Sequence, residues 1–341
     1  MVGGHPGQRV ALIVTVLDEA STIDDLLDSI ARQTRAPDEV VVVDGGSQDG
    51  TWNRLQNRAA GLPLRCIRVP GAGIARGRNL AVQAASADLI AVTDAGVRLE
   101  PDWLEQLLAA LGPDVDVVSG FFGADATTTF EQAMGATVLP ALEDIDPAKF
   151  LPSSRSVLFR RAAWAAVGGY PAWLDYSEDL VFDLDVKRAG YRFVFAPRAL
   201  VWFRPRESFR AFFRQYFRYA RGDGKAGLWL RRHAIRYATY LVAAGLLVAS
   251  MRSHSAAAGC TTVRRGQWVA RLCLIAGVLA YTRRPYTRLA PHLRHLSPAQ
   301  AVYALGLVPV LRLVGDLAKM LGYPVGVIWR VRRAWTSRSS S

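Results

Sequence analysis

The chain has 341 residues, enough for about two structural units, and 51% of its residues are hydrophobic while 21% are charged. The net charge of +13 is unevenly divided: residues 1–200 hold 18 Lys/Arg and 26 Asp/Glu, whereas residues 201–341 hold 24 and 3. The basic part is also rich in Leu, Val, Phe and Trp, so its charge favours contact with an anionic membrane surface over nucleic-acid binding.

The cysteine residues and the N-terminal residues give an indication of the cellular compartment of the protein. Cys66, Cys260 and Cys273 are an odd number without metal-ligand spacing, so we expect no disulfide framework and a reducing, cytoplasmic location for the first part of the chain. Residues 1–8 are Gly-rich and polar, which predicts no cleavable secretion signal. The apolar run Val10–Leu17 is too short to span a bilayer.

Predicted strands and helices alternate up to about residue 205. Arg9–Leu17 and Glu39–Val43 are apolar runs rich in β-branched residues, typical of parallel strands buried on both faces. Ser21 and Thr22 can cap a helix that runs to about Gln33. The other expected elements are helices over 51–60, 74–85, 101–111, 160–167 and 178–189, and strands over 64–69, 89–93, 115–122, 153–159, 191–195 and 199–203. This alternation predicts a Rossmann-like α/β domain, a mostly parallel sheet with helices on both faces, with ligands at the carboxyl ends of the strands.

Two acidic residues stand at such strand ends. Asp44 opens DGGSQDGT, where the carboxylate can accept hydrogen bonds from a base or ribose and the glycines allow close approach; a tight turn capped by Asp49 or Thr51 fits as well. Asp94, in TDAG, is placed to hold a divalent ion that neutralises a diphosphate leaving group, although a loop-starting Asp explains it too.

A third acidic site is the pair Glu178-Asp179 at the start of a predicted helix. The helix dipole favours negative charge there, so a capping role is one interpretation. In the functional interpretation, Asp179 takes a proton from an acceptor hydroxyl as it attacks an anomeric carbon.

Five motifs in this order resemble the landmarks of family 2 glycosyltransferases with the GT-A fold, over about residues 9–220. The nearest branch is similar to the succinoglycan-type exopolysaccharide transferases. The motifs are Asp44 in DGGSQDGT, Arg78-Asn79 in GIARGRNLA, Asp94 in TDAG, Gly168-Gly169 in AAVGGY and Glu178-Asp179 in SEDLVFDLDVKRAGYRFVFAP.

The resemblance implies an inverting transferase that uses a nucleotide-sugar donor. Asp44 would contact the base, Asp94 would begin the metal-binding Asp-x-Asp motif, and Asp179, beside Glu178, would be the catalytic base. Gln215 to Tyr219 resembles a shortened Gln-x-x-Arg-Trp motif. The residues assigned to donor binding are Asp18, Glu19, Asp44, Gly46, Ser47, Arg78, Asn79, Asp94, Gln215 and Arg218.

Departures from the family pattern bear on the cofactor. Gly96 stands where the second Asp of Asp-x-Asp is expected, and Phe203-Arg204 stands near where many relatives have a His. Mg²⁺ or Mn²⁺ would then be held mainly by Asp94 and the nucleotide phosphates. Alternatively, positive charge comes from Arg204, Arg206 or Arg218.

The segment GAGIARG is an incomplete dinucleotide fingerprint. Arg76 replaces its third glycine, and a helix cap explains the pattern equally well. A dehydrogenase is therefore disfavoured.

The C-terminal part reads as membrane-associated helices. Residues 206–230 predict a basic aromatic helix suited to the bilayer interface, and residues 231–341 predict apolar, basic helices. We expect two to four membrane segments, with Arg330–Arg333 on the cytoplasmic side. The apolar runs are Tyr237–Met251, Trp268–Tyr281 with Arg271 inside it, and Ala299–Trp329, which is either two short segments or a re-entrant hairpin with Arg312 and Asp316 paired at i, i+4.

The sequence thus predicts a GT-A catalytic domain over residues 1–205 that faces the cytoplasm at the cytoplasmic membrane. It would move a sugar from a nucleotide-sugar donor to a lipid-linked or polysaccharide acceptor, without a nucleic-acid partner. A non-catalytic nucleotide- or glycan-binding membrane scaffold is the alternative, motivated by Gly96. A helical cap on a soluble enzyme is the alternative for the tail.

Overall fold

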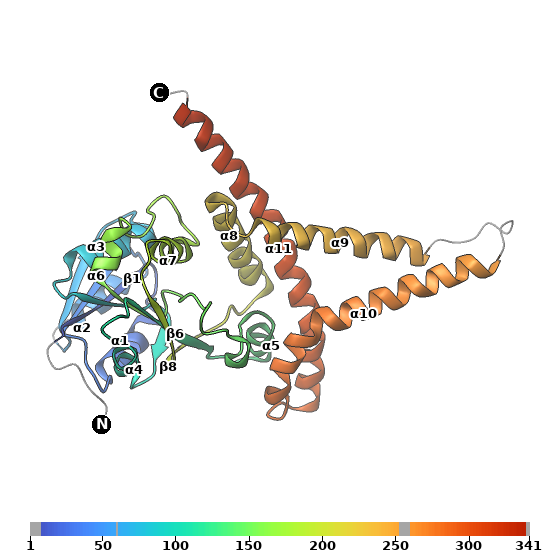
Figure 1. The fold of residues 1–341 in the computed structure, drawn as a ribbon. Helices are drawn as coiled ribbons and strands as arrows, with labels where there is room; N and C mark the ends of the chain where they lie inside the picture. The colour runs from blue at the N-terminus through green and yellow to red at the C-terminus, as the bar shows by residue number, and fades with distance from the viewer. Residues whose placement is uncertain (1–7, 59–60, 252–259, 339–341) are drawn as a thin grey trace. The chain divides into compact units, whose positions relative to one another are not determined.

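The computed structural model describes residues 8–58, 61–251 and 260–338, which divide into two compact units (Figure 1). The sheet unit comprises Met1–Ala126 and Pro140–Pro205, and the helical unit comprises Thr127–Leu139 and Arg206–Ser341. The expectation about a secretion signal and the end of the helix predicted over 51–60 fall on residues outside the described part.

The sheet unit is built on eight strands in the order β3-β2-β1-β4-β7-β6-β8-β5. Four neighbouring pairs are parallel, β1 with β2 and β4, β2 with β3, and β6 with β8, whereas β4–β7, β6–β7 and β5–β8 are antiparallel. The strands are β1 Val10–Val16, β2 Glu39–Asp44, β3 Leu64–Arg68, β4 Leu89–Val92, β5 Val97–Leu99, β6 Val117–Ala124, β7 Val157–Arg160 and β8 Phe193–Phe203.

The sheet is therefore mixed, and the prediction that it is mostly parallel was wrong for its second half. The helix between β6 and β7, α5 (Thr129–Val138), belongs to the helical unit instead of forming a crossover that returns the chain in parallel, and β7 enters antiparallel to both β4 and β6. The two closing strands expected over 191–195 and 199–203 are one strand, β8, with a register shift against β6.

Helices of the sheet unit cover both of its faces. They are α1 Ile23–Ala31, α2 Thr51–Arg58, α3 Ile74–Ala84, α4 Trp103–Ala109, α6 Arg161–Ala166 and α7 Glu178–Arg188, with a short 3-10 turn at Leu142–Asp144. The expected capping of α1 was wrong, because Thr22 makes no side-chain capping bond and its hydroxyl donates to the Glu19 carboxylate at 2.6 Å.

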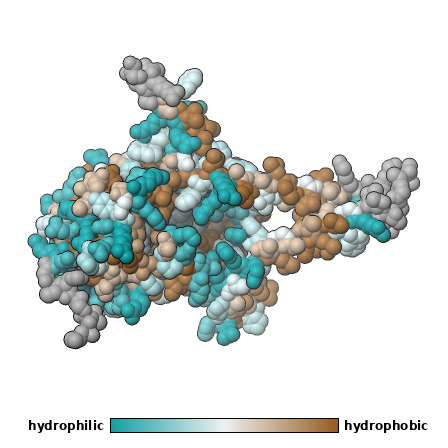
Figure 2. Space-filling model, in the orientation of Figure 1, coloured by the Kyte–Doolittle hydropathy of each residue, from teal (hydrophilic) through white to brown (hydrophobic). Residues whose placement is uncertain are grey.

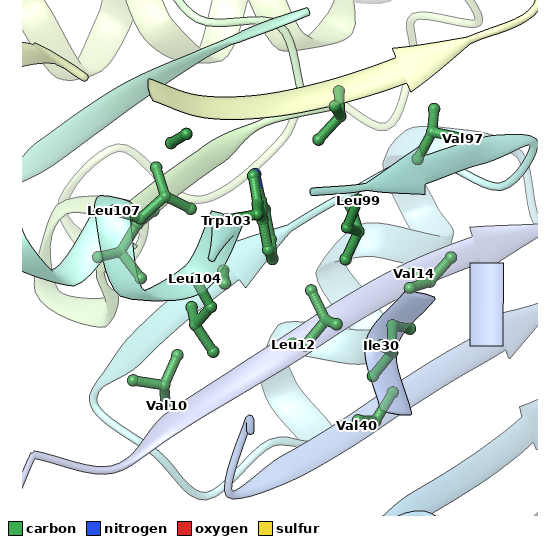
Figure 3. Close-up of a cluster of buried hydrophobic side chains, with 14 of the residues drawn as sticks. Val10, Leu12, Val14, Ile30, Val40, Val97, Leu99, Trp103, Leu104 and Leu107 are labelled. Atoms are coloured by element: carbon green, nitrogen blue, oxygen red, sulfur yellow. The ribbon is translucent and has the colours of Figure 1, made fainter. Parts of the chain in front are cut away.

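Strand β1 explains why both faces are covered, because all of its residues but Thr15 are buried. On one face Leu12 and Val14 lie in a cluster with Ile30 of α1 and Trp103 of α4 (Figure 3). The alternate residues, such as Ile13, lie in a second cluster with residues of α3, α6 and α7. Successive side chains of this apolar strand point to opposite faces of the sheet, so the strand contributes to two hydrophobic cores. A shift of the strand by one residue would exchange the two sets of side chains, which fixes its register.

The helical unit contains α5 Thr129–Val138, α8 Phe209–Ala226, α9 Leu230–Met251, α10 Cys260–Leu293 and α11 Pro298–Arg338. Its core joins residues of α5, α8, α10 and α11, including Met134, Phe212, Leu289 and Leu311. Helices α8 and α11 approach closely. A Cβ at Gly326 would lie 2.1 Å from the Arg221 carbonyl oxygen, so only glycine permits this contact.

Helix α11 corrects two predictions. It is one helix, so the interpretation of residues 299–329 as two short segments or a re-entrant hairpin was wrong. Arg312 does not pair with Asp316, since Asp316 instead accepts a hydrogen bond from Arg236 of α9 at 2.8 Å.

Two helices of the described residues, Leu230–Met251 and Pro298–Thr336, are long and apolar enough to cross a membrane, which is weak evidence by itself. Figure 2 shows hydrophobic residues at the surface of α9 and α10. The side chains of Leu241, Val242, Leu272 and Leu279 are all more than half exposed.

Candidate active site

The loops after β1 and β2 form the first part of the site. The buried Asp44 carboxylate accepts hydrogen bonds through Oδ1 from the backbone nitrogens of Gly46 (2.9 Å) and Ser47 (2.8 Å) and from the Ser47 hydroxyl (2.7 Å). The same hydroxyl accepts from the backbone nitrogen of Asp18 at 2.9 Å. Asp18, Asp44, Gly46 and Ser47 are thus brought together, as the strand-end rule predicts.

The second carboxylate oxygen of Asp44 has no hydrogen-bond partner among the described residues, although it is buried. The nearest cation is Arg68, whose Nε lies 3.7 Å away. Because a buried acceptor without a donor costs free energy, this oxygen is suited to receive an N–H or O–H group from a ligand.

The centre of the site is Arg78, which is 1% exposed on α3. Its Nη2 donates to Asp94 Oδ1 and its Nη1 to Glu178 Oε1, both at 2.6 Å. The guanidinium therefore joins the loop after β4 to the start of α7, and Arg78 itself lies 100 positions before Glu178 in the chain. The two carboxylates hold the pKa of Arg78 above its usual value against the effect of burial.

Glu178 and Asp179 differ in environment although they are adjacent. Glu178 is buried, and burial together with the charge of Asp179 raises its pKa to about 7, while Arg78 opposes the shift. Asp179 is only partly buried, and its Oδ2 accepts a weak hydrogen bond from the Ser154 backbone nitrogen at 3.5 Å. Of the two, Asp179 is the carboxylate that a substrate can reach.

The turn into α7 is conformationally unusual. Ser177 has φ 65°, and Asp18 of the β1 loop has φ 55°, a region that non-glycine residues rarely adopt. Strained positions of this kind concentrate at functional sites, and both of these adjoin or belong to the predicted site.

The side chain of Asn79 is held in place by hydrogen bonds to other residues of the protein. Its amide nitrogen donates to the Tyr170 carbonyl at 2.8 Å, and its oxygen accepts from the Tyr170 nitrogen at 2.8 Å and from Trp164 Nε1 at 3.0 Å. A Cβ at Gly169 (φ +81°) would lie 2.6 Å from this oxygen, so the Gly168-Gly169 turn is shaped around Asn79. This placement favours a positioning role for Asn79 over direct donor contact.

Glu19 connects the two halves of the site. A Cβ at Gly96 would lie 3.4 Å from Glu19 Oε2, so the loop after β1 touches the loop after β4. Strands β2, β1 and β4 are adjacent and parallel, and their carboxyl ends carry Asp44, Asp18 and Asp94 at one edge of the sheet. The ion pair of Arg78 with Glu178 brings Glu178 and its neighbour Asp179 to this edge as well.

Two residues near the site were not predicted. Arg155 places its Nε 3.9 Å from Asp94 Oδ2, and its backbone oxygen accepts from the Thr93 hydroxyl at 2.9 Å. Asp183, one helical turn after Asp179, is 3% exposed and its Oδ2 lacks a partner among the described residues. Burial and the Asp179 charge raise the pKa of Asp183 well above its usual range.

The described residues do not fit a cation site made by protein ligands alone. They contain no group of three or more His, Cys, Asp and Glu side chains arranged to hold a metal. Asp94 Oδ1 is occupied by Arg78, and Gly96 offers no side chain.

Gln215 and Arg218 belong to the helical unit. Gln215 donates through Nε2 to the Tyr219 hydroxyl at 2.8 Å, one turn along α8. The other residues assigned to donor binding lie in the sheet unit. Their role in donor binding remains a prediction.

Comparison with known proteins agrees with this geometry. The sequence model of Glycosyl transferase family 2 matches residues 11–162, and that of Glycosyl transferase family group 2 matches residues 89–282, more than half of the chain. The chain belongs to the family 2 glycosyltransferases. This glycosyltransferase is thus an enzyme rather than the non-catalytic scaffold considered as the alternative.

Relatives of this glycosyltransferase cover most of its length. It is 28% identical over 302 residues to the succinoglycan biosynthesis protein ExoA of Rhizobium meliloti, with 82% of this chain and 88% of that protein covered. It is 26% identical over 229 residues to the glycosyltransferase AglE of Haloferax volcanii, with 65% and 74% covered. The resemblance to exopolysaccharide transferases is therefore confirmed.

A solved structure shows the same fold. The mannosyltransferase PcManGT from Pyrobaculum calidifontis, in complex with GDP-Man and Mn²⁺, superposes with a TM-score of 0.53 at 20% identity. The match covers 94% of this chain and 89% of that one. The expected GT-A character of the sheet unit is confirmed at this level.

Proposed function

We propose that this glycosyltransferase transfers a sugar from a nucleotide-sugar donor with inversion, and that Asp179 is the catalytic base. The observation that carries the proposal is the arrangement around Arg78, which holds Asp94 and Glu178 at 2.6 Å each and thereby places Asp179 at the same sheet edge. Asp179 is the more exposed member of the Glu178-Asp179 pair.

In this mechanism Asp179 accepts the proton of an acceptor hydroxyl. The hydroxyl oxygen forms a bond to the anomeric carbon while the bond from that carbon to the diphosphate oxygen breaks, and the nucleoside diphosphate leaves. Because attack and departure occur on opposite sides in one step, the configuration inverts. Arg78 and Glu178 are positioning residues, which hold the side chains of Asp94 and Asp179 in place relative to each other.

Donor binding is assigned to the loops after β1 and β2. The free oxygen of Asp44 is suited to a base or ribose donor group, and Asp18 and Ser47 keep the loops together. Asp94, beside Arg155, is assigned to the diphosphate of the donor. A divalent cation bound by nucleotide phosphates and Asp94 would add positive charge there, as the Mn²⁺ of the mannosyltransferase complex suggests for the fold.

The acceptor is proposed to be a lipid-linked or polysaccharide glycan at the cytoplasmic face of the membrane. Support comes from the relative in succinoglycan biosynthesis and from the two apolar helices that are long enough to span a bilayer. Fractionation of cells checks the location. The full chain should be extracted from membranes by detergent and not by high salt, and release by salt alone would contradict it.

The catalytic assignment is tested with Asp179→Asn. The variant should lose transfer by at least about 100-fold, the lower range for loss of a general base, and should bind the nucleoside diphosphate as the wild type does. Asp185→Asn on the same helix is the matched control, because the Asp185 side chain is 43% exposed and forms an ion pair only with Arg188 among the described residues. Near-wild-type turnover of Asp179→Asn would show that another group is the base.

A further inference from the structure

The helical unit contains a charged group of side chains between α9, α10 and α11, in a region whose outward residues are apolar. We call it the polar cluster; it consists of Arg236, Tyr240, Tyr281, Arg312, Asp316 and Lys319. None of these residues takes part in the sheet-edge site, so the cluster needs an explanation of its own.

Asp316 is the only carboxylate of the cluster. Its Oδ1 accepts from Arg236 Nε at 2.8 Å, and its Oδ2 accepts from the Tyr281 hydroxyl. Lys319 Nζ lies 3.8 Å from Oδ1, beyond hydrogen-bond distance. Asp316 is thus occupied by a guanidinium and a phenol, and it compensates one positive charge.

No carboxylate forms an ion pair with Arg312 in the described part of the chain. Its guanidinium lies over the ring of Tyr281, 4.2 Å from the centroid, and donates through Nη2 to the Tyr281 carbonyl at 3.1 Å. Its Nε is buried and has no hydrogen-bond partner among the described residues. A buried N–H donor without an acceptor is costly, and a ligand oxygen would satisfy it.

The charges of the cluster do not balance. Three cations, Arg236, Arg312 and Lys319, face one carboxylate, which leaves two positive charges in excess. A further carboxylate, Asp223, lies 3.4 Å from His233 Nε2 and also attracts Lys319, which reduces the excess to one positive charge. In apolar surroundings such an excess is unfavourable unless an anion neutralises it.

The cluster is reachable from outside the protein. The Lys319 side chain is 27% exposed and that of Arg236 is 19% exposed. Around them the helices present exposed Leu241 of α9, Leu279 of α10 and Leu313 of α11. Cations within an apolar surface match a molecule with a phosphate at one end and hydrocarbon at the other.

We propose that the polar cluster binds the phosphomonoester or diphosphate end of a lipid. Arg312 and Lys319 contact the phosphate oxygens, and Asp316 holds Arg236 and Tyr281 in place beside them. The site rests on the membrane association in the proposed function and is independent of the chemistry at Asp179.

Binding to the purified full chain in detergent tests this site, with short-chain phosphatidic acid as the phosphomonoester lipid and phosphatidylcholine as the reference. We expect phosphatidic acid to bind at least about 10-fold more tightly, and Arg312→Gln to weaken it by about 10-fold, the loss of one charge-assisted contact. Lys319→Gln should weaken it in the same direction. Arg283→Gln, an exposed arginine of α10, should change binding by less than about 2-fold.

The outcomes separate the possibilities. Equal binding of the two lipids, or equal losses in Arg283→Gln and Arg312→Gln, would overturn the site. Competition by inorganic pyrophosphate as strong as that by phosphatidic acid would overturn its assignment to a lipid. Asp179→Asn should bind phosphatidic acid as the wild type does, so a failed catalytic assignment is distinguishable from a failed lipid site.

Discussion

The two units of this glycosyltransferase place charge and hydrophobic surface in opposite positions. In the sheet unit the strands are buried on both faces, and only Leu17, Leu142 and Trp173 are exposed large hydrophobic residues among those described. In the helical unit the exposed large hydrophobic residues are numerous along α9, α10 and α11, while Asp316 and Arg236 lie inward. The first pattern is typical of a domain in water, and the second of helices in an apolar medium.

The sheet unit nevertheless has charges inside it, at the site. Removing the buried ion pairs of Arg78 should have the largest effect on the stability of the protein. Arg78→Met leaves Asp94 and Glu178 without their shared cation, so the free energy of unfolding should fall by about 3–5 kcal/mol. Urea unfolding followed by tryptophan fluorescence measures it. Arg76→Met, an exposed position on the same helix, is the control, and equal destabilisation by both would contradict the role given to the buried pairs.

A Leu→Ala substitution in each unit compares how much a leucine side chain contributes to stability in the two units. Leu12→Ala in β1, where the side chain is fully buried, should cost about 2–5 kcal/mol of unfolding free energy. Leu241→Ala in α9, where the residue is 74% exposed, should cost less than about 0.5 kcal/mol in detergent. Unfolding of both variants in the same micelles checks this, and a large loss in Leu241→Ala would mean that protein covers this face of α9.

The smallest expected effect is a pH dependence. The pKa of Glu178 is raised to about 7, so the folded state holds its proton more tightly than the unfolded state does. Stability should therefore fall as the pH rises from about 4.5 to about 7, by about 1–3 kcal/mol. Glu178→Gln should flatten this slope in melts at pH 5 and pH 8. If the pH dependence of stability is unchanged in Glu178→Gln, another titrating group causes it.

Much of the first half of the sheet could be predicted from the sequence, for a physical reason. The continuous apolar runs of β1 and β2 suit only strands buried on both faces, and the strand-end rule then places Asp44 and Asp94 at one edge. Arg155 could not be found in this way. It lies beside Asp94 because β7 pairs antiparallel with β4, and that pairing depends on tertiary contacts that no local pattern carries.

The sequence contains local signals for Asp183 and for α5. Asp183 lies four residues after Asp179, the spacing that puts two side chains on the same face of a helix. Helix α5 begins with Thr128 and Glu131, whose reciprocal bonds form a capping box, and the Thr-x-x-Glu spacing is visible in the sequence. The sequence does not predict α11 as one helix, because Arg312, Asp316 and Lys319 interrupt its apolar run, whereas in the structure these side chains contact α9 and α10 or one another.

Helix α5 gives the chain an unusual dependence between its parts. It lies in the sequence between β6 and β7, yet it belongs to the helical unit, where Met134 lies in a shared core and the Leu139 carbonyl accepts a hydrogen bond from Arg288 at 2.6 Å. A fragment that ends at Pro205 would keep α5 and lose everything that covers it. A truncation at that boundary should therefore aggregate unless Phe130 and Met134 are replaced by polar residues, because the sequence of the sheet unit contains one helix whose apolar side chains pack in the helical unit.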